Sequence, residues 1–430
     1  MTDNNLKVLS VCTSDSGGGA ARAAYRIHQG VRELGVDSRM FVKNKCTKDT
    51  NVIGLDVFVP HTPIYQAFDW IRNKFKNKVQ HFRWNQYPER DKNFMSDLRG
   101  TDLHGALQKL DYDVLHLHWI NQRFIPLDKL PQDKPIVWTL HDSWPFCGVC
   151  HYFLECEGYK SHCGCCPFLH SRKVNDLSYQ IWKKKAQIYK NLNLHIVTPS
   201  HWLGNCAKES SLFGRFPVTV IYNCLDVNVF QPLSKDDIVQ RWQNLKQISN
   251  RKQLLLFGAV NASKDKIKGF NYLISALHFI EQQGRIDDFE LVVFGADKTE
   301  VNIEIKTPIH YVGYVGDADE LVSLYNLASV MVVPSMTEVF GQTASEALAC
   351  ETPVVAFQCT GIQEVVDHKI DGYLAKPYES EDLAEGILWC LENNENNRLG
   401  KAGREKVLKD YTFDVVCGKY KALYEKVTHN

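Results

Sequence analysis

The sequence predicts an α/β protein with two doubly wound, parallel-sheet domains that face each other across a cleft. Short β-branched runs alternate with longer amphipathic stretches, which is typical of parallel strands covered by helices on both faces. The 430 residues hold too many of these units for one sheet. A stretch of turn formers at 223–232 separates an earlier series of units from a later one. We therefore expect two Rossmann-like domains that hold substrate at the carboxyl ends of their strands.

The two series define the expected domains. The earlier series contains candidate strands at 7–12, 38–42, 114–118, 136–140, 195–199 and 218–222. The later series contains candidate strands at 253–258, 290–295, 310–312, 330–334 and 353–356. Helical patterns occupy 20–34 and 270–282. The predicted parts are an N-terminal domain at 1–224 with a cysteine-rich insert at 147–167, a C-terminal domain at 225–411, and a C-terminal helix at 412–430 that packs back toward the first domain.

The composition excludes some classes of function. Lys plus Arg and Asp plus Glu number 50 each, so no overall charge favours nucleic acid as a partner. No window of about 18 apolar residues predicts a membrane-spanning helix. The N-terminus has neither the basic start nor the long apolar stretch of a signal peptide, so we expect a cytoplasmic protein.

A glycine-rich turn, DSGGGAAR at 15–22, directly follows the first candidate strand. Glycines permit close backbone approach, and the start of the following helix presents free N–H groups to an anion. We take Gly18 and Gly19 as candidate donor-binding residues. The spacing fits neither a nicotinamide fingerprint nor a P-loop. A flexible strand-to-helix turn without a ligand is the alternative.

A second turn of this kind follows the candidate strand at 330–334. The backbone N–H groups of Phe340, Gly341 and Gln342 open a helix and can cradle a phosphate. Glu346 lies about one and a half turns into that helix, where a carboxylate can accept hydrogen bonds from vicinal hydroxyls. The alternative for Glu346 is a solvated helix residue.

Glu338 and Glu346, eight residues apart, resemble the paired-glutamate motif of the retaining glycosyltransferases of family 4. Further segments that match the pattern of this family are VIYNCLD at 220–226, YVGYV at 311–315, LYNLA at 324–328, TGIQE at 360–364 and DGY at 371–373. The resemblance implies the GT-B architecture, with the acceptor mainly on the N-terminal domain and the nucleotide-sugar mainly on the C-terminal one. It also implies retention at the anomeric carbon and no metal cofactor for the chemistry.

The resemblance further implies roles for individual residues. Glu346 would hold the ribose, Glu338 would lie beside the donor sugar, and Lys268 of the Lys-Gly pair would bind the diphosphate. The family usually carries an arginine shortly before that lysine, and the loop here has none. Lys264 or Lys266 is the candidate for the second positive charge, although a lysine lacks the bidentate fork of arginine.

Two histidines end neighbouring candidate strands. His118 closes the run DVLHLHW at 113–119, and His141 follows the strand at 136–140. By resemblance, His118 points at the donor sugar and is the better candidate of the two. A buried histidine satisfied by a backbone partner is the alternative for each.

Six of the 14 cysteines lie between Cys147 and Cys166. The run WTLHDSWPFCGVCHY at 138–152 is similar to a subset of family 4 that assembles bacterial exopolysaccharides, including colanic acid. Four cysteines recur in that subset, and their spacing suits a structural, non-catalytic zinc ion. Two disulfides or free thiols are the alternatives. The matching residues here are Cys150, Cys156, Cys163 and Cys166.

We therefore expect a hexosyltransferase-type enzyme that moves a sugar from a nucleotide-diphosphate sugar to a saccharide or lipid-linked saccharide acceptor, in bacterial surface polysaccharide biosynthesis. Apolar residues share one helical face of 68–82 beside basic ones, so this stretch is a candidate for peripheral contact with anionic lipid at the inner face of the membrane. A helix packed on its own domain is the alternative. A sugar-nucleotide epimerase, a phosphorylase or a non-catalytic nucleotide-sugar-binding protein on the same scaffold stays open.

Overall fold

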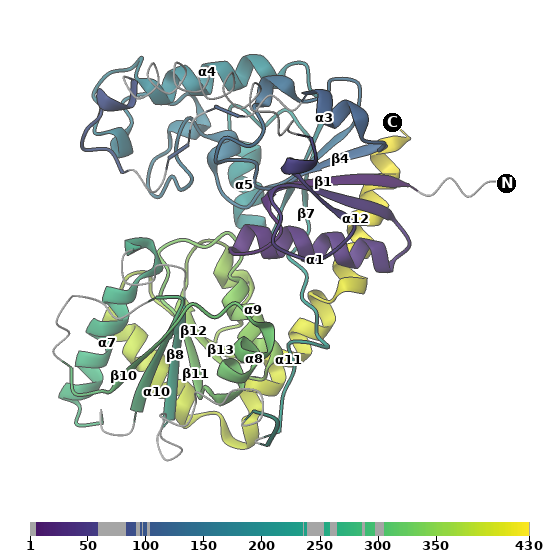
Figure 1. The fold of residues 1–430 in the computed structure, drawn as a ribbon. Helices are drawn as coiled ribbons and strands as arrows, with labels where there is room; N and C mark the ends of the chain where they lie inside the picture. Colours follow the sequence, from purple (N-terminus) through teal and green to yellow (C-terminus); the bar gives the residue numbers. More distant parts are fainter. Residues whose placement is uncertain are drawn as a thin grey trace. The chain divides into compact units, whose positions relative to one another are not determined.

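The computed structural model describes residues 6–58, 83–91, 95–96, 98–100, 104–234, 236–238, 253–258, 265–285, 289–296 and 305–429. Two features of the sequence, the amphipathic stretch at 68–82 and Lys264, lie outside these residues. The chain divides into two compact units, and each contains a parallel sheet with helices packed on it (Figure 1). The first unit comprises Met1–Ile221 and Cys417–Asn430, and the second comprises Tyr222–Val416.

The first unit is built on a seven-stranded sheet in the order β3-β2-β1-β4-β5-β6-β7. Every described pairing is parallel; in the register, Val8 pairs with Ser38 on one side and Val114 on the other. The central strands are buried along their whole length, as expected for a parallel sheet covered on both faces. The strands are β1 (Lys7–Ser14), β2 (Asp37–Asn44), β3 (Val52–Gly54), β4 (Val114–Leu117), β5 (Ile136–Thr139), β6 (Leu194–Thr198) and β7 (Val218–Val220).

Two helices of the first unit begin at residues whose side chains cap them. The helices of this unit are α1 (Gly19–Glu33), α3 (His104–Lys109), α4 (Leu177–Tyr189) and α5 (His201–Glu209). The side chains of Ser200 and Asp176 accept hydrogen bonds from the backbone N–H groups three residues later, at Leu203 and Tyr179, and so cap helices α5 and α4.

The C-terminal helix α12 (Phe413–Thr428) contributes its residues from Cys417 onward to the first unit. The hydroxyl of Tyr420 lies 2.9 Å from Oγ1 of Thr139, and that of Tyr424 lies 2.7 Å from Nδ1 of His116. Both tyrosines are fully buried, so the helix is fixed to the sheet by apolar packing and two internal hydrogen bonds.

The second unit is built on a six-stranded parallel sheet in the order β10-β9-β8-β11-β12-β13. Alternate residues of β8 point to opposite faces. Leu254 and Leu256 join one apolar core and Leu255 and Phe257 join the other. The strands are β8 (Gln253–Gly258), β9 (Phe289–Phe294), β10 (Ile309–Gly313), β11 (Val330–Val333), β12 (Val354–Phe357) and β13 (Gly372–Ala375).

Helices cover both faces of this second sheet. One core includes residues of α8 (Ala318–Leu327), α9 (Gln342–Ala349) and α11 (Arg398–Asp410). The other core includes residues of α7 (Phe270–Gln282) and α10 (Ser380–Glu392). The second sheet therefore has the doubly wound arrangement that the sequence predicts.

The observed division of the chain follows Ile221, whereas the sequence places the domain boundary after residue 224. Tyr222 joins the second unit because its ring packs against the rings of Tyr411 and Phe340, at 5.4 and 6.0 Å between centroids. Two strands, β3 and β13, are absent from the predicted set. In the described part of the chain, no helix combines the length and the apolar character needed to span a membrane.

Candidate functional site

Each sheet has one point at which the strand order reverses. In the first unit this point lies between β1 and β4, and in the second it lies between β8 and β11. Ligands of doubly wound sheets bind beyond the carboxyl ends of the strands at such points. The loops that follow these four strands carry most of the residues singled out in the sequence.

Lys268 and Gly269 follow β8 in the second unit. The Asp265 side chain accepts a hydrogen bond from the N–H of Ile267 at 3.0 Å and so begins the short 3-10 turn that carries Lys268. Gly269 adopts a φ of 74°, and a Cβ there would lie 1.8 Å from the carbonyl oxygen of Pro334. Only glycine fits this position, where the two loops meet.

The loop after β11 places Glu338 against Lys268. The Nζ of Lys268 lies 2.7 Å from Oε1 of Glu338, and the two side chains are 21% and 19% exposed. The backbone of Glu338 is fixed as well, because its N–H donates to Oγ1 of Thr360 and its carbonyl accepts from the N–H of Gly361. The structure therefore brings together two residues that lie 70 positions apart in the sequence.

Helix α9 begins beside this ion pair. Gly341 precedes the helix with a φ of 104°, and Gln342 is its first residue. Phe340 is buried, with its ring 5.2 Å from that of Tyr411, so the turn is anchored in the core. The start of the helix gives the loop a positive partial charge, which suits an anion.

Glu346 lies in the same helix and is completely buried. One of its carboxylate oxygens, Oε2, accepts a hydrogen bond from the hydroxyl of Tyr325 at 2.9 Å. The alternative of a solvated helix residue is therefore wrong for this position. Burying a carboxylate costs free energy unless the group is hydrogen-bonded, and the hydroxyl of Tyr325 supplies one such bond to Glu346.

In the first unit, the glycine-rich turn follows β1 as expected. Gly18 is extended and precedes α1, and Gly19 is the first residue of that helix. Among the described atoms, nothing lies within 4 Å of a Cβ placed on Gly17 or Gly18. The backbone at this turn is therefore open to an approaching group.

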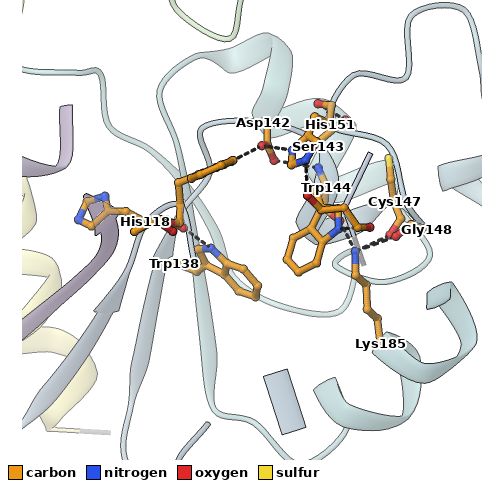
Figure 2. Close-up of polar contacts among 12 residues, drawn as sticks. His118, Trp138, Asp142, Ser143, Trp144, Cys147, Gly148, His151 and Lys185 are labelled. Atoms are coloured by element: carbon orange, nitrogen blue, oxygen red, sulfur yellow. Dashed lines mark hydrogen bonds and ion pairs between the residues drawn. The ribbon is translucent and has the colours of Figure 1, made fainter. Parts of the chain in front are cut away.

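His118 follows β4 and is almost fully buried. Its carbonyl accepts from the indole N–H of Trp138 (Figure 2). Its ring is tilted against that of His116, with 4.0 Å between the centroids, and its Nδ1 lies 3.0 Å from Nε2 of His141. Within the described part of the chain, its Nε2 has no hydrogen-bond partner. Burial and the two neighbouring histidines lower the pKa of His118 well below its usual value, so the ring is neutral at pH 7.

The cysteine-rich insert contains free thiols. All fourteen cysteines lie in the described residues, and none of them forms a disulfide there. Cys163 accepts from the N–H of Gly148 at 3.1 Å, and Cys150, Cys163 and Cys166 are buried. Among the described residues, no three ligating side chains converge on a point that could hold a metal ion. The thiols as placed do not form a tetrahedral site, and zinc at Cys150, Cys156, Cys163 and Cys166 stays a prediction for metal analysis of the purified protein.

Two family models match the chain. The model described as Glycosyltransferase Family 4 matches residues 17–229, and the model described as Glycosyl transferases group 1 matches residues 240–406. The chain belongs to the group 1, family 4 glycosyltransferases. The resemblance drawn from the paired glutamates is therefore confirmed.

Curated relatives of this glycosyltransferase include bacterial and archaeal proteins. A putative colanic acid biosynthesis glycosyl transferase of Escherichia coli K12, WcaC, is 26% identical over 271 residues, which are 60% of this chain and 61% of that protein. An uncharacterized glycosyltransferase of Methanocaldococcus jannaschii is 31% identical over 167 residues, covering 37% of this chain and 45% of that protein. The chain spans about half the length of the curated relatives it matches.

Solved structures share the fold of this glycosyltransferase. A glycosyltransferase from Rickettsia africae has a TM-score of 0.63 at 16% identity, covering 99% of this chain and 100% of that one. Anabaena HepE, in complex with UDP and glucose, has a TM-score of 0.64 at 16% identity, covering 98% and 100%. At these identities the likeness shows the fold, and it confirms the GT-B class of two Rossmann-like domains.

The glycosyltransferase also contains a buried lysine that sequence reasoning missed. The ammonium group of Lys185, on α4, donates to the carbonyls of Trp144, Cys147 and Gly148, and it lies 3.7 Å from the Trp144 ring centroid (Figure 2). Burial lowers the pKa of Lys185 to about 7. In the sequence it ends a run of three lysines, a pattern typical of a solvated helix face, so only the fold reveals its burial.

A second missed feature is a carboxylate–imidazole pair. Asp142, just after β5, accepts from Nδ1 of His151 at 2.5 Å, from the indole N–H of Trp119 at 2.8 Å and from the backbone N–H of Trp144 at 3.0 Å. Burial alone would raise the pKa of Asp142, but His151 and the other donors outweigh it and lower that pKa. His151 in turn lies 2.8 Å from Oγ of Ser96 through its Nε2.

Proposed function

We propose that this glycosyltransferase moves a sugar from a nucleotide-diphosphate sugar to a saccharide or lipid-linked saccharide acceptor, with retention at the anomeric carbon and without a divalent cation. The observation that carries the proposal is the ion pair of Lys268 and Glu338 beside the start of α9, with the buried Glu346 in the same helix. An anion site next to two carboxylates suits a diphosphate joined to a sugar on one side and a ribose on the other.

On the donor side, the backbone N–H groups of Phe340, Gly341 and Gln342 bind the diphosphate together with Lys268. A helix start and an ammonium group stabilise the charge that develops on the leaving diphosphate. When the diphosphate binds Lys268, the ion pair is broken and the carboxylate of Glu338 is available to the donor sugar. Lys264 is the proposed second cation of this loop.

The buried carboxylate of Glu346 receives the ribose hydroxyls. Its hydrogen bond from Tyr325 holds one carboxylate oxygen in place, so the group is oriented before the nucleotide arrives. Tyr325 acts here as a positioning residue.

The first unit contributes its own residues to the reaction. We assign Gly18 and Gly19 to the donor, since a Cβ placed on Gly18 meets no described atom within 4 Å and Gly19 begins helix α1, and we assign His118 to the donor sugar. The neutral imidazole of His118, with Nε2 unpartnered in the described structure, is suited to a hydrogen bond with a sugar hydroxyl.

The comparisons support the substrate classes. Anabaena HepE is solved with UDP-glucose, and a pneumococcal O-GlcNAc transferase is solved with UDP and GlcNAc. A Campylobacter jejuni relative, 31% identical over 120 residues, is an N-acetylgalactosaminyltransferase acting on a diphospho-undecaprenol-linked sugar. With WcaC, this relative favours surface polysaccharide biosynthesis in the cytoplasm, at the inner face of the membrane. Residues 68–82 are the proposed contact with anionic lipid.

A nucleotide screen followed by product analysis tests the proposal. We expect one of UDP, GDP, ADP or CMP to raise the melting temperature, by an amount equivalent to about 2.7 kcal/mol at a hundredfold excess over its Kd. The shift should be lost in Lys268→Ala and Glu346→Ala. Nucleoside diphosphate released only when acceptor is present, with an α-linked product from an α-linked donor, identifies a retaining transferase. Interconversion of the donor without acceptor would instead identify an epimerase, and binding without turnover would identify a binding protein.

A further inference from the structure

We propose that Ser96, His151 and Asp142 form a catalytic triad that hydrolyses carboxylic esters, with Ser96 as the nucleophile. The three side chains form an unbroken chain of hydrogen bonds within the first unit. Oγ of Ser96 lies 2.8 Å from Nε2 of His151, and Nδ1 of His151 lies 2.5 Å from Oδ2 of Asp142. The Ser96–His151 distance falls within the hydrogen-bond range of a nucleophile and its base, and the His151–Asp142 contact is a short one of the kind made by a carboxylate.

The carboxylate of Asp142 fixes the protonation of the imidazole. Asp142 is an acceptor for the indole N–H of Trp119 and the backbone N–H of Trp144 as well as for His151. Because Nδ1 of His151 donates to this carboxylate, the lone pair of the neutral ring is on Nε2 and faces Ser96. Ser96 therefore donates its hydroxyl hydrogen to the atom that would remove it.

The backbone holds the three residues in this arrangement. Both the N–H and the hydroxyl of Ser143 donate to the carbonyl of His151, at 2.9 and 2.8 Å (Figure 2). The N–H of Ser96 donates to the carbonyl of Val149, and the carbonyl of Ser96 accepts from the indole of Trp144. These bonds join Ser96 to residues 142–151, which are distant from it in sequence, so the geometry exists before any substrate binds.

Exposure distinguishes the roles of the three residues. Asp142 and His151 have side chains 8% and 11% exposed, whereas Ser96 is intermediate in exposure. The orienting carboxylate is thus shielded from water, while part of the surface of Ser96 is exposed. The chain order Ser, Asp, His is also one of the orders in which such triads occur.

The reaction needs only the ester and water. Oγ of Ser96 attacks the ester carbonyl carbon as its proton moves to Nε2 of His151, and the alcohol leaves with that proton. Water then attacks the acyl-Ser96 carbonyl, gives a proton to His151, and releases the carboxylic acid as Ser96 regains its hydrogen. No oxidation or reduction takes place, and the step is independent of glycosyl transfer.

Another serine–histidine pair in the same unit provides a matched control. Oγ of Ser38 lies 2.8 Å from Nδ1 of His28, but Ser38 is 1% exposed and the nearest His28–Asp49 approach is 3.8 Å. Ser38 therefore has a hydrogen bond to a histidine, but it is buried, and its histidine has no carboxylate within hydrogen-bond distance among the described contacts. It should remain unreactive.

The experiment uses a fluorophosphonate probe and p-nitrophenyl acetate on the full chain. We expect one phosphonyl adduct per chain, mapped to Ser96 by peptide mass spectrometry, and its loss in Ser96→Ala and His151→Gln. Ester hydrolysis should fall to background in these variants and by about 10⁴-fold in Asp142→Asn, while Ser38→Ala keeps both readouts.

The outcome that overturns the triad is a wild-type chain that takes no adduct, or takes it on another residue. Hydrolysis that persists in folded Ser96→Ala would overturn it as well, with melting curves showing that the variant is folded. Because the adduct is mapped on the wild-type chain, a variant that fails to fold does not obscure the result.

Discussion

Lys268 and Glu338 form an ion pair in the second unit, with Nζ of the lysine 2.7 Å from Oε1 of the glutamate. We assign Lys268 to the diphosphate of the donor and Glu338 to the donor sugar. In the unliganded protein they therefore neutralise each other, and a bound diphosphate must compete with the carboxylate for the lysine. Removing the carboxylate of Glu338 should therefore change nucleotide binding and sugar transfer in opposite directions.

Replacing Glu338 by Gln should tighten the binding of a nucleoside diphosphate while slowing transfer. The lysine loses its carboxylate partner, and a partly exposed pair of this kind contributes about 1 kcal/mol at most, which corresponds to roughly a fivefold change in Kd. Calorimetric titration measures the Kd, and donor turnover with acceptor measures the rate. Weaker diphosphate binding in this variant would contradict the assignment of Lys268.

Glu346→Gln should weaken the binding of a nucleoside diphosphate more than it weakens the binding of inorganic pyrophosphate. Only the nucleotide carries ribose hydroxyls for the carboxylate, and loss of a hydrogen bond to a charged group costs about 1.5–3 kcal/mol. Competition titrations with both ligands give the two affinities. Equal losses for both ligands would mean that Glu346 acts on the diphosphate or on the fold.

Tyr325→Phe is the companion variant, because it keeps the ring and removes only the hydroxyl that donates to Glu346. Loss of a hydrogen bond to a charged group costs about 1.5–3 kcal/mol, so the free energy of unfolding should fall by that amount. Urea denaturation measures it. An unchanged midpoint would show that the hydroxyl contributes nothing to the orientation of Glu346.

The sequence alone predicts those site residues that belong to one short, recognisable stretch. Glu338 and Gly341 lie in one short loop after an apolar run, so their pattern is readable without the fold. The burial of Glu346 was not readable, since it depends on Tyr325, which lies 21 positions away on another helix. Lys185 looked solvated for the same reason.

The hydrogen bonds around His151 could not be predicted from any local sequence pattern. Asp142 appeared in the sequence beside His141, and His151 beside Cys150, without any indication that they meet. Their contact depends on the path of the cysteine-rich insert, which folds back over the end of β5. Ser96 joins through an antiparallel bridge between Met95 and Cys150, a pairing of segments 55 residues apart.

Two glycine substitutions should separate stability from binding. Gly269→Ala places a Cβ 1.8 Å from the carbonyl oxygen of Pro334 at a φ of 74°, so we expect a loss of about 2–4 kcal/mol in unfolding free energy. Gly18→Ala has an extended backbone and open space around the new atom, and it should leave stability unchanged. Weaker donor binding in Gly18→Ala at unchanged stability would support its role at the phosphate, and unchanged binding would remove Gly18 from the site.

Lys185→Met should change how stability depends on pH. The pKa of Lys185 falls from 10.5 to about 7 in the folded chain, because burial disfavours the charged form. Between these two values the unfolded chain binds more protons than the folded one, so this group makes stability rise with pH there. The rise is at most about 1.4 kcal/mol per pH unit. Since methionine has no such titration, the wild-type free energy of unfolding should increase relative to the variant between pH 7 and about 9. Urea unfolding of both proteins at several pH values measures the difference, and parallel curves would show that Lys185 stays charged inside its cage of carbonyl groups.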